Sequence, residues 1–368
     1  MTNHNIIVSN SASIPQIETG TVNLIVTSPP YPMIEMWDEI FTCQDPEIGL
    51  ALSNNDGTAA FNKMHDILDS VWNECDRVLA ENGFICINIG DATRTINDCF
   101  QLYSNHTRII QFFLNRGYSV LPDIHWRKKS NAPNKFMGSG MYPAGAYVTY
   151  EHEYILIFRK GGKRTFKGDE KLRRQKSAFF WEERNVWFSD LWDIKGVSQK
   201  ILKSASRKRS AAFPFEVPYR LVNMYSVEGD TVLDPFSGLG TTSLACMAAK
   251  RNSIGVDIDS DIVSLAMENI KSSMKALNLI IENRLREHIA FIDALPEEKK
   301  SKWITNEKSR NYVQKLRSEY QAIMSASGTI LADNPRLNVR LKNKKSPTRI
   351  IFDPNNKIPL NYNVFKAD

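Results

Sequence analysis

The sequence predicts an α/β protein with a doubly wound, mostly parallel sheet. Short apolar segments alternate with segments of helical spacing, and turn residues separate the two kinds. Strands are expected at residues 5–9, 22–26, 84–89, 118–126, 154–158, 231–233 and 253–257. Helices are expected at residues 58–80, 97–115, 214–225, 241–250 and 259–288. This rhythm stops near residue 290, so the remainder is expected to be an appended segment.

Breaker residues set the ends of these elements. Pro29-Pro30 ends the second strand, because proline cannot donate a hydrogen bond within a central strand. Asn82-Gly83 ends the first helix, and Gly117 ends the second. Residues 32–57 are polar and irregular and are predicted to form a loop. Residues 128–150 are too long for a plain connection, which favours a functional loop.

The composition is that of a folded protein. Hydrophobic residues make up 42% of the 368 residues, charged residues make up 24%, and the mean hydropathy is −0.35. No apolar run approaches the roughly 18 residues of a membrane helix, and the start of the chain lacks the layout of a secretory signal. The five cysteines form no CxxC pair, which argues against a disulfide framework or a zinc site. We therefore expect a cytoplasmic protein without a membrane partner or a metal.

The net charge of +6 is unevenly distributed. Residues 159–176 contain nine basic and two acidic side chains, residues 195–209 form a second basic stretch, and an aromatic block at 179–192 separates them. Basic side chains attract phosphate without reading sequence, although a lone basic run is most often a solvated surface. The candidate DNA contacts in these stretches are Lys163, Arg164, Arg173, Arg174, Lys203 and Arg207.

A glycine-containing turn, DPFSGLGTT, follows the strand at 231–233. Gly238 and Gly240 let the backbone approach a ligand, and the next helix offers unpaired N–H donors at its start. Asp257, at the end of the following strand, is placed to bind ribose hydroxyls. Ser243 stands where a phosphate-binding loop has its third glycine, so a nucleoside without phosphates is favoured. An ordinary turn is the alternative interpretation.

The segment Thr27-Ser28-Pro29-Pro30-Tyr31 directly follows the strand at 22–26. Ligands in open α/β sheets bind outside the carboxyl ends of strands. At such a position Ser28 and the Pro29 carbonyl are rigidly presented hydrogen-bond acceptors, and Tyr31 is a flat stacking surface. A proline-stiffened turn with a packed tyrosine is the plainer interpretation.

Together, the TSPPY and DPFSGLGTT segments resemble the beta class of amino-methylating DNA methyltransferases. In that class the catalytic motif precedes the cofactor motif, and the target-recognition region lies between them. The resemblance covers residues 5–274, and the segments 126–128 and 150–154 resemble motifs that flank its base pocket. Serine at the first position of SPPY is typical of N4-cytosine enzymes, whereas aspartate or asparagine is typical of N6-adenine enzymes. Many relatives carry an acid near position 10, where this chain has Asn10, so Asn10 is given no role.

The resemblance implies a seven-stranded methyltransferase sheet and S-adenosylmethionine as the cofactor. It implies that Ser28 and the Pro29 carbonyl accept hydrogen bonds from the target amine, while Tyr31 stacks on a base flipped out of the duplex. The catalytic set is Ser28, Pro29, Pro30 and Tyr31. Cofactor contacts are expected from the two turns that follow the later strands: Asp234, Phe236, Ser237, Gly238, Gly240, Thr241, Asp257 and Ile258. The chain has no Pro-Cys dipeptide, which disfavours C5-cytosine chemistry.

The same resemblance implies a catalytic half (1–159), a target-recognition insert (160–210) and a cofactor half (211–289). The C-terminal extension (290–368) is mixed in charge and contains many Lys and Arg, so it is expected to contact DNA or a second subunit. The expected partner is double-stranded DNA, in a restriction-modification system with a cognate restriction endonuclease, and the protein is a monomer or a homodimer.

Three alternatives remain open: an N6-adenine enzyme with the same pocket, a methyltransferase of RNA or another amine, and an inactive DNA-binding protein. Both motifs are intact, which argues against the inactive protein. The extension shows no convincing acidic cluster for a fused nuclease.

Overall fold

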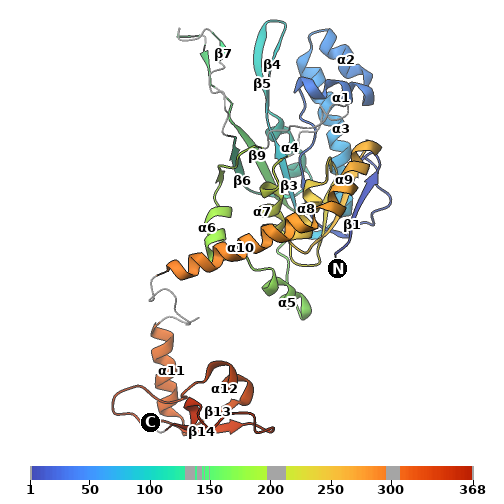
Figure 1. Ribbon diagram of the computed structural model, residues 1–368. Coiled ribbons are helices and arrows are strands. Elements are labelled where there is room, and N and C mark those ends of the chain that lie inside the picture. The colour runs from blue at the N-terminus through green and yellow to red at the C-terminus, as the bar shows by residue number, and fades with distance from the viewer. Residues whose placement is uncertain are drawn as a thin grey trace. The chain divides into compact units, whose positions relative to one another are not determined.

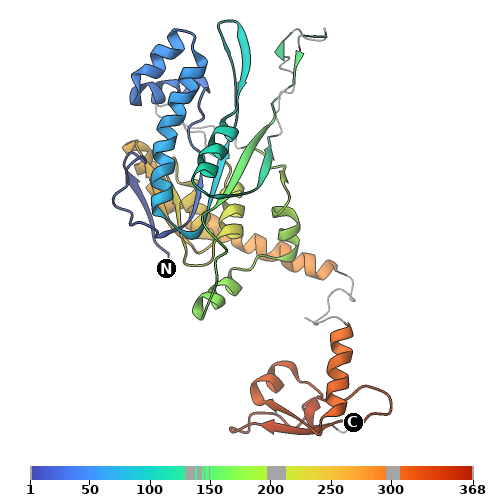
Figure 2. The ribbon, with the colours of Figure 1, turned by 180° about the vertical axis from the view of Figure 1, so that it is seen from behind.

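The computed structural model describes residues 2–128, 137–138, 143–144, 146–148, 150–196, 213–295 and 307–366. The chain forms two compact units, Met1–Phe291 and Ile292–Asp368. The larger unit is built on an eight-stranded sheet with helices on both faces, as Figures 1 and 2 show from opposite sides. In the described part of the chain, no helix is both long and apolar enough to cross a membrane.

The sheet has the strand order β1-β12-β11-β2-β3-β9-β6-β10. Its strands are β1 (His4–Val8), β2 (Val22–Thr27), β3 (Leu79–Ile89), β6 (Ser119–Arg127), β9 (His152–Arg159), β10 (Leu191–Trp192), β11 (Thr231–Asp234) and β12 (Asn252–Asp257). Strand β9 is antiparallel to β3 and β6, and the other pairs are parallel. The mostly parallel α/β prediction is confirmed. The predicted count of seven strands was one too low, because Leu191 and Trp192 in the predicted insert pair with β6.

Two hydrophobic clusters pack on opposite faces of this sheet. Helices α3 (Gly57–Val78) and α4 (Asn105–Asn115) cover one face. Helices α7 (Glu216–Tyr225) and α8 (Thr241–Ala248) cover the other. Successive residues such as Leu24 and Ile25 are therefore fully buried, one on each face. This double coverage explains why the central strands are continuous apolar runs without alternation.

The helix predicted at 97–115 begins later than expected. Residues before it form a hairpin of β4 (Ala92–Ile96) and β5 (Cys99–Tyr103), and the helix α4 starts at Asn105. Asn97 and Asp98 lie between the two strands with φ of 49° and 59°. Asparagine and aspartate tolerate this left-handed conformation, which two-residue hairpins require. The Asn-Asp pair was the overlooked sequence signal.

The predicted loop at 32–57 is also largely helical. It contains η1 (Glu35–Trp37), α1 (Asp38–Gln44) and α2 (Pro46–Ser53). The Asp45 side chain caps α2 by accepting the Glu47 N–H at 2.9 Å, and Pro46 occupies the first turn. Phe41 and Ile48 are fully buried, so apolar packing holds this segment in place.

The helix predicted at 259–288 is two helices, α9 (Ser260–Ser272) and α10 (Met274–Ala294), separated at Ser273. Val263, Ala266 and Ile270 of α9 pack against Ile6 of β1. The boundary between the compact units follows Phe291. The predicted functional division of the chain stays a prediction. Most of the predicted functional loop at 128–150 lies outside the described residues, apart from the short pair β7 (Met137–Gly138) and β8 (Ala146–Tyr147).

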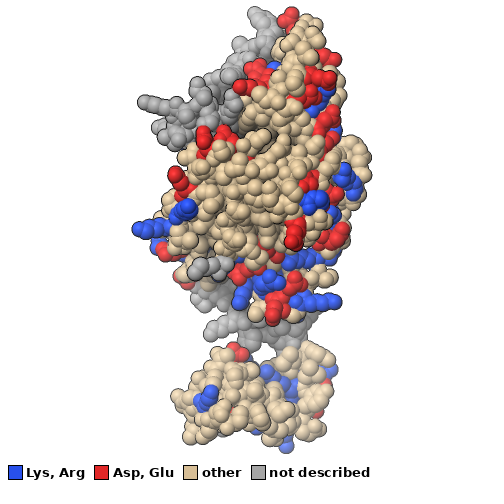
Figure 3. Space-filling model, turned by 90° about the vertical axis from the view of Figure 1, so that its right-hand side faces the viewer, with Lys and Arg blue, Asp and Glu red and all other residues tan. Residues whose placement is uncertain are grey.

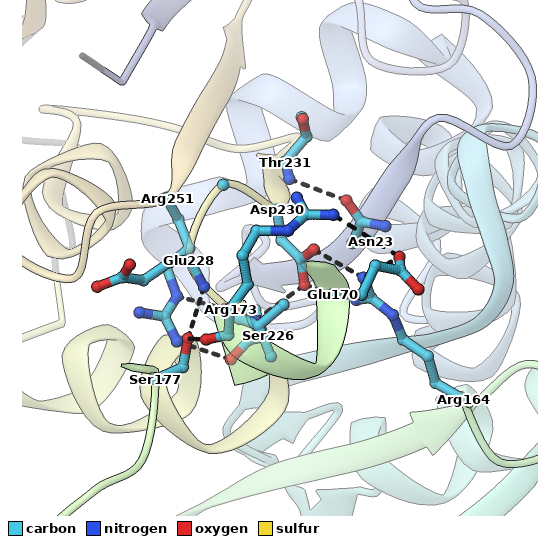
Figure 4. Close-up of polar contacts among 12 residues, drawn as sticks. Asn23, Arg164, Glu170, Arg173, Ser177, Ser226, Glu228, Asp230, Thr231 and Arg251 are labelled. Carbon is cyan, nitrogen blue, oxygen red and sulfur yellow. Dashed lines mark hydrogen bonds and ion pairs between the residues drawn. The ribbon is translucent and has the colours of Figure 1, made fainter. Parts of the chain in front are cut away.

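The described part of the predicted insert contains α5 (Asp169–Lys176), α6 (Trp181–Trp187) and β10. An ion pair attaches this segment to the start of β11: Arg164 donates two hydrogen bonds to the buried Asp230 carboxylate, at 2.7 and 3.0 Å. Figure 4 shows this pair beside Ser177, whose hydroxyl accepts the Glu228 N–H at 2.7 Å. The basic helix α5 is thus fixed at the edge where the parallel strands begin.

The smaller unit has its own core. It contains α11 (Glu307–Glu319), β13 (Ala322–Ala326), α12 (Ser327–Asp333), β14 (Thr348–Phe352) and η3 (Asn363–Phe365). Strands β13 and β14 are parallel neighbours, as expected for two strands joined through a helix. Ile330, Leu337, Ile358 and Val364 form the buried centre.

Replacing Arg164 with methionine should lower the free energy of unfolding by about 3 kcal/mol, because it leaves a buried carboxylate without its partner. Urea denaturation would measure this loss. Lys163→Met is the matched control, since Lys163 is exposed and its replacement should change stability by less than about 0.5 kcal/mol. Equal stability of the two variants would contradict a structural role for the Arg164–Asp230 pair.

Candidate active site

The two sequence motifs meet at the carboxyl edge of the sheet, in a cavity of about 920 Å³. Thr27 and Asp234 are 207 positions apart in the chain, but β2 and β11 are parallel neighbours. The turns that follow these strands therefore open on the same side. Ser28, Pro29, Pro30 and Tyr31 line one part of the cavity, and residues 234–239 and 257–259 line another.

Asp234 joins these two turns. Its carboxylate accepts hydrogen bonds from the Thr27 hydroxyl at 2.7 Å, the Thr242 hydroxyl at 2.6 Å and the Phe236 N–H at 3.1 Å. Burial raises the pKa of Asp234 to about 6, although these three donors act in the opposite direction. Both carboxylate oxygens already have partners within the chain. Its predicted contact with the cofactor stays a prediction.

The glycine turn is shaped for close approach. Gly238 and Gly240 have φ of 49° and 80°, and a Cβ atom added at Gly238 would meet nothing within 4 Å. Gly240 is the N-cap of α8, so the first N–H groups of that helix face the turn. Asp257 accepts the Gly238 N–H at 3.0 Å, which ties the turn to the end of β12. Burial raises the pKa of Asp257.

The residues present fit a nucleoside cofactor. The Ser237 hydroxyl is buried without a partner among the described residues, so it is available to a ligand. Thr241 lies on the cavity wall, and Ile258, 64% exposed, lies at its rim. A volume of about 920 Å³ is at the upper end of the roughly 300–1,000 Å³ of small-molecule sites. It leaves room for a base beside the cofactor.

The TSPPY turn (27–31) is held in place by Asn105 of α4. Its amide donates to the carbonyls of Pro32 and Gly90, at 3.1 and 3.0 Å, and so joins the chain after Tyr31 to the chain after β3. The His65 ring donates to the Asn105 oxygen at 2.9 Å. Burial lowers the pKa of His65 to about 4, so this ring is neutral and orients the amide.

Four of the cavity residues without a role assigned from the sequence lie around the TSPPY turn. They are Asn88 at the end of β3, Trp126 and Lys128 at the end of β6, and Glu153 in β9. A polar Asn88 in an otherwise apolar strand was the available signal, and the other three lie in segments that resemble pocket-flanking motifs. Asn10, set aside in the sequence analysis, also lines the cavity.

Asn88 and Glu153 surround the Tyr31 hydroxyl. Asn88 donates to the Tyr31 oxygen and to Glu153, both at 2.8 Å, and the Tyr31 hydroxyl donates to Glu153 at 3.0 Å. Burial and the Glu153 charge raise the pKa of Tyr31 well above its usual range, so its hydroxyl keeps its proton.

The predicted DNA contacts that the structure describes do not line this cavity. Arg164 is paired with Asp230, which precedes β11, whereas the cavity opens after Asp234 at the other end of that strand. Lys163, Arg173 and Arg174 are exposed in the same segment as Arg164, while Lys203 and Arg207 lie outside the described residues. On the face seen in Figure 3, Lys and Arg are interspersed with Asp and Glu and do not form one basic patch. The described residues contain no group of three or more His, Cys, Asp or Glu side chains that could hold a metal.

Comparison with known proteins agrees with this geometry. The family model of the N6 and N4 DNA methylases matches residues 22–268. The chain belongs to this DNA methylase family. It is 55% identical to the type II methyltransferase M.MthZI of Methanothermobacter thermautotrophicus, over 79% of this chain and 83% of the relative. It is 47% identical to the type II methyltransferase M.MjaI of Methanocaldococcus jannaschii, over 76% of this chain and 94% of the relative.

One solved structure of a similar protein contains a bound cofactor. A candidate DNA modification methylase of Thermus thermophilus, in complex with S-adenosyl-L-methionine, has a TM-score of 0.56 and 29% identity, and the match covers 73% of this chain and 93% of that one. The molecule bound in that structure is the cofactor that the sequence predicts for this DNA methyltransferase. A second family model, the RibD C-terminal domain, matches residues 294–368. The predicted DNA or subunit contact of this extension stays a prediction.

Asp234 should make the stability of the methylase depend on pH. Its pKa is about 6 in the folded protein, against an ordinary value of 3.8, so the stability it contributes is fully present below pH 4 and is lost as pH rises through 6. The difference in unfolding free energy between the wild type and Asp234→Asn should therefore fall by about 3 kcal/mol over this window. Urea denaturation between pH 4 and pH 7 would measure it, and a constant difference would contradict the buried, raised pKa.

Proposed function

We propose that this methylase transfers the methyl group of S-adenosylmethionine to the exocyclic N4 amine of cytosine in duplex DNA. The observation that supports the reaction is the pair of acceptors at Ser28 and Pro29, held rigidly in the same cavity as the glycine turn. The choice of cytosine rests on the serine at position 28. An N6-adenine enzyme is the second candidate, because the same two acceptors would serve its amine.

The two acceptors at Ser28 and Pro29 would counter the main chemical obstacle, which is that the exocyclic amine is a poor nucleophile. The lone pair of the amine is delocalised into the ring, and hydrogen bonds from its N–H groups to Ser28 Oγ and the Pro29 carbonyl favour a localised lone pair. S-adenosylmethionine, when bound, would supply an electrophilic methyl group for direct attack. The N–C bond would form as the S–C bond breaks, S-adenosylhomocysteine would be the leaving group, and the surplus amine proton would pass to water. The chain contributes positioning and electrostatics, and needs no covalent intermediate.

A target amine is out of reach inside the stacked duplex, so the base must rotate out into the cavity. Tyr31 would stack on it, and Pro30 keeps the turn rigid. In the part of the cavity proposed for the cofactor, Asp257 would accept hydrogen bonds from the ribose hydroxyls, and Ile258 would pack on the adenine. Phe236, Ser237, Gly238, Gly240 and Thr241 would line the rest, with Asp234 toward the methionine part.

We further propose that the exposed cations Lys163, Arg173 and Arg174 contact DNA phosphates outside the recognition site. Arg164 is not included, because Asp230 holds its guanidinium. Residues 160–210 would recognise the target together with neighbouring loops. The curated relatives are named type II methyltransferases, which supports a role in a restriction-modification system beside an endonuclease of the same specificity. We propose a monomer or a homodimer.

The decisive experiment is transfer of labelled methyl groups to mixed-sequence duplex DNA, followed by nucleoside digestion and mass spectrometry. We expect N4-methylcytosine. Ser28→Ala should lower kcat by on the order of 100-fold, since it removes one acceptor of the target amine. The control Ser264→Ala alters an exposed serine whose hydroxyl donates to the Ser260 carbonyl of its own helix α9.

N6-methyladenine as the product would overturn the proposed base and keep the chemistry. Methylation of RNA alone would overturn the proposed substrate. Cofactor binding without any methylated nucleoside would favour the inactive DNA-binding protein.

The phosphate contacts predict a smaller salt dependence of DNA binding in a triple variant. Replacing Lys163, Arg173 and Arg174 with alanine should reduce the slope of log K against log salt by about 0.9 for each phosphate contact that is removed. Fluorescence anisotropy of labelled DNA, measured between about 50 and about 200 mM salt, would give this slope. A variant with Lys271, Lys275 and Arg286 replaced removes the same charge from exposed positions of α9 and α10. Identical slopes in the two variants would contradict the proposed contacts.

A further inference from the structure

The serine at position 28 raises a question of hydrogen-bond direction. A hydroxyl carries one proton and two lone pairs, so it accepts a bond from the target amine only when a lone pair faces the base. Ser28 Oγ lies 3.2 Å from the Tyr31 oxygen, and either of the two could donate. The direction of this bond decides what Ser28 presents to the cavity.

The surroundings of Tyr31 determine that direction. The single Tyr31 proton goes to the Glu153 carboxylate at 3.0 Å, which has no proton to give in return. Tyr31 therefore cannot donate to Ser28, and Ser28 donates to Tyr31. With its proton directed at Tyr31, the Ser28 hydroxyl is left to accept on its remaining sides.

Asn88 reinforces the same polarity. Its amide has two protons, and its shortest bonds go to Tyr31 and Glu153, both at 2.8 Å, while Ser28 Oγ is farther away at 3.4 Å. The two Tyr31 lone pairs are thus used by Asn88 and Ser28. A flipped amide would place its oxygen against the Glu153 carboxylate, so this orientation of Asn88 is required.

Lys128 completes the network at Glu153. Its ammonium group forms an ion pair with Oε1, the carboxylate oxygen that Tyr31 does not use, and lies 4.6 Å from the centre of the Trp126 ring. Glu153 is 9% exposed, so its charge is little screened by water. The ion pair places a cation against the side of the Glu153 carboxylate that faces away from Tyr31.

From this geometry we infer that Glu153 is a positioning residue that acts through Tyr31 to orient the Ser28 hydroxyl as an acceptor. The inference rests on the proposed function, because it concerns how Ser28 receives the target amine. Glu153 does not touch the reacting atoms. Its effect should therefore be on kcat, with cofactor affinity unchanged.

The first test is Glu153→Gln. If the new side-chain amide turned its nitrogen toward Tyr31, it would donate to the Tyr31 oxygen and reverse the direction of the hydrogen bonds. If it turned its nitrogen toward Lys128, the amide N–H groups would face the Lys128 ammonium group, which is also a donor. We expect kcat to fall between about tenfold and a hundredfold, while the Kd for S-adenosylmethionine, measured by calorimetry, stays within twofold. Glu268→Gln, at an exposed position of α9 outside the cavity wall, is the matched control and should keep the wild-type kcat.

Two further variants distinguish orientation from general damage. Adding Lys128→Met to Glu153→Gln lets the amide oxygen face Tyr31, so Glu153→Gln should cost less in that background. Tyr31→Phe keeps the stacking ring but removes the hydroxyl that links Ser28 to Glu153. The double variant Tyr31→Phe, Glu153→Gln should therefore lower kcat no more than the single variant with the larger effect.

The inference is overturned if Glu153→Gln keeps the wild-type kcat, if its effect multiplies with that of Tyr31→Phe, or if it weakens cofactor binding to the same extent as kcat. None of these results bears on the reaction itself, which the wild-type product identifies. A wild type that makes no methylated base would overturn the proposed function first.

Discussion

The buried Asp234 carboxylate is the contact on which the active site depends. Two hydroxyls and one backbone N–H converge on it, one from the end of β2 and two from the turn and helix after β11. A lone buried carboxylate is costly, and these donors are what offset the cost. The same bonds fix the distance between the TSPPY turn, where we propose that the target base binds, and the glycine turn, where we propose that the cofactor binds. A direct transfer between two bound molecules requires that distance to be constant.

The order of the strands turns this local contact into an active site. Because β2 lies between β11 and β3, the TSPPY turn has the glycine turn on one side and Asn88 on the other. The antiparallel strand β9 then brings Glu153 next to the end of β3. The antiparallel direction matters, since it puts the first residues of β9 at the edge where the parallel strands end. A sheet of parallel strands alone would have placed Glu153 at the opposite edge.

The sequence was sufficient for the fold class and for the convergence of the two motifs, because both follow from periodicity and from the rule that ligands bind at carboxyl strand ends. It was not sufficient for Asn88 and Glu153. Their roles arise from pairing across strands 65 positions apart, which no local pattern encodes. Local signals did exist for the hairpin, in the pair Asn97-Asp98, and for the helices within 32–57, in a helix cap. Those helices also needed the burial of Phe41 and Ile48 to stabilise them. The basic segment could be recognised in the sequence. The ion pair between Arg164 and Asp230 could not be predicted, because it joins residues that only the tertiary structure brings together.

Serine at position 28 makes the site depend on more residues than aspartate would. An ionised carboxylate has no proton to misdirect, so it accepts from an amine in any arrangement of its neighbours. A hydroxyl needs neighbours that fix where it donates, and here the Tyr31 oxygen, Asn88 and the Glu153 carboxylate do so. An aspartate at the same position would add a second negative charge close to Glu153. Such a pair would disfavour ionisation of one of the two carboxyls. The residue at position 28 and the charge of Glu153 are therefore physically linked, and a change of one alters what the other must supply.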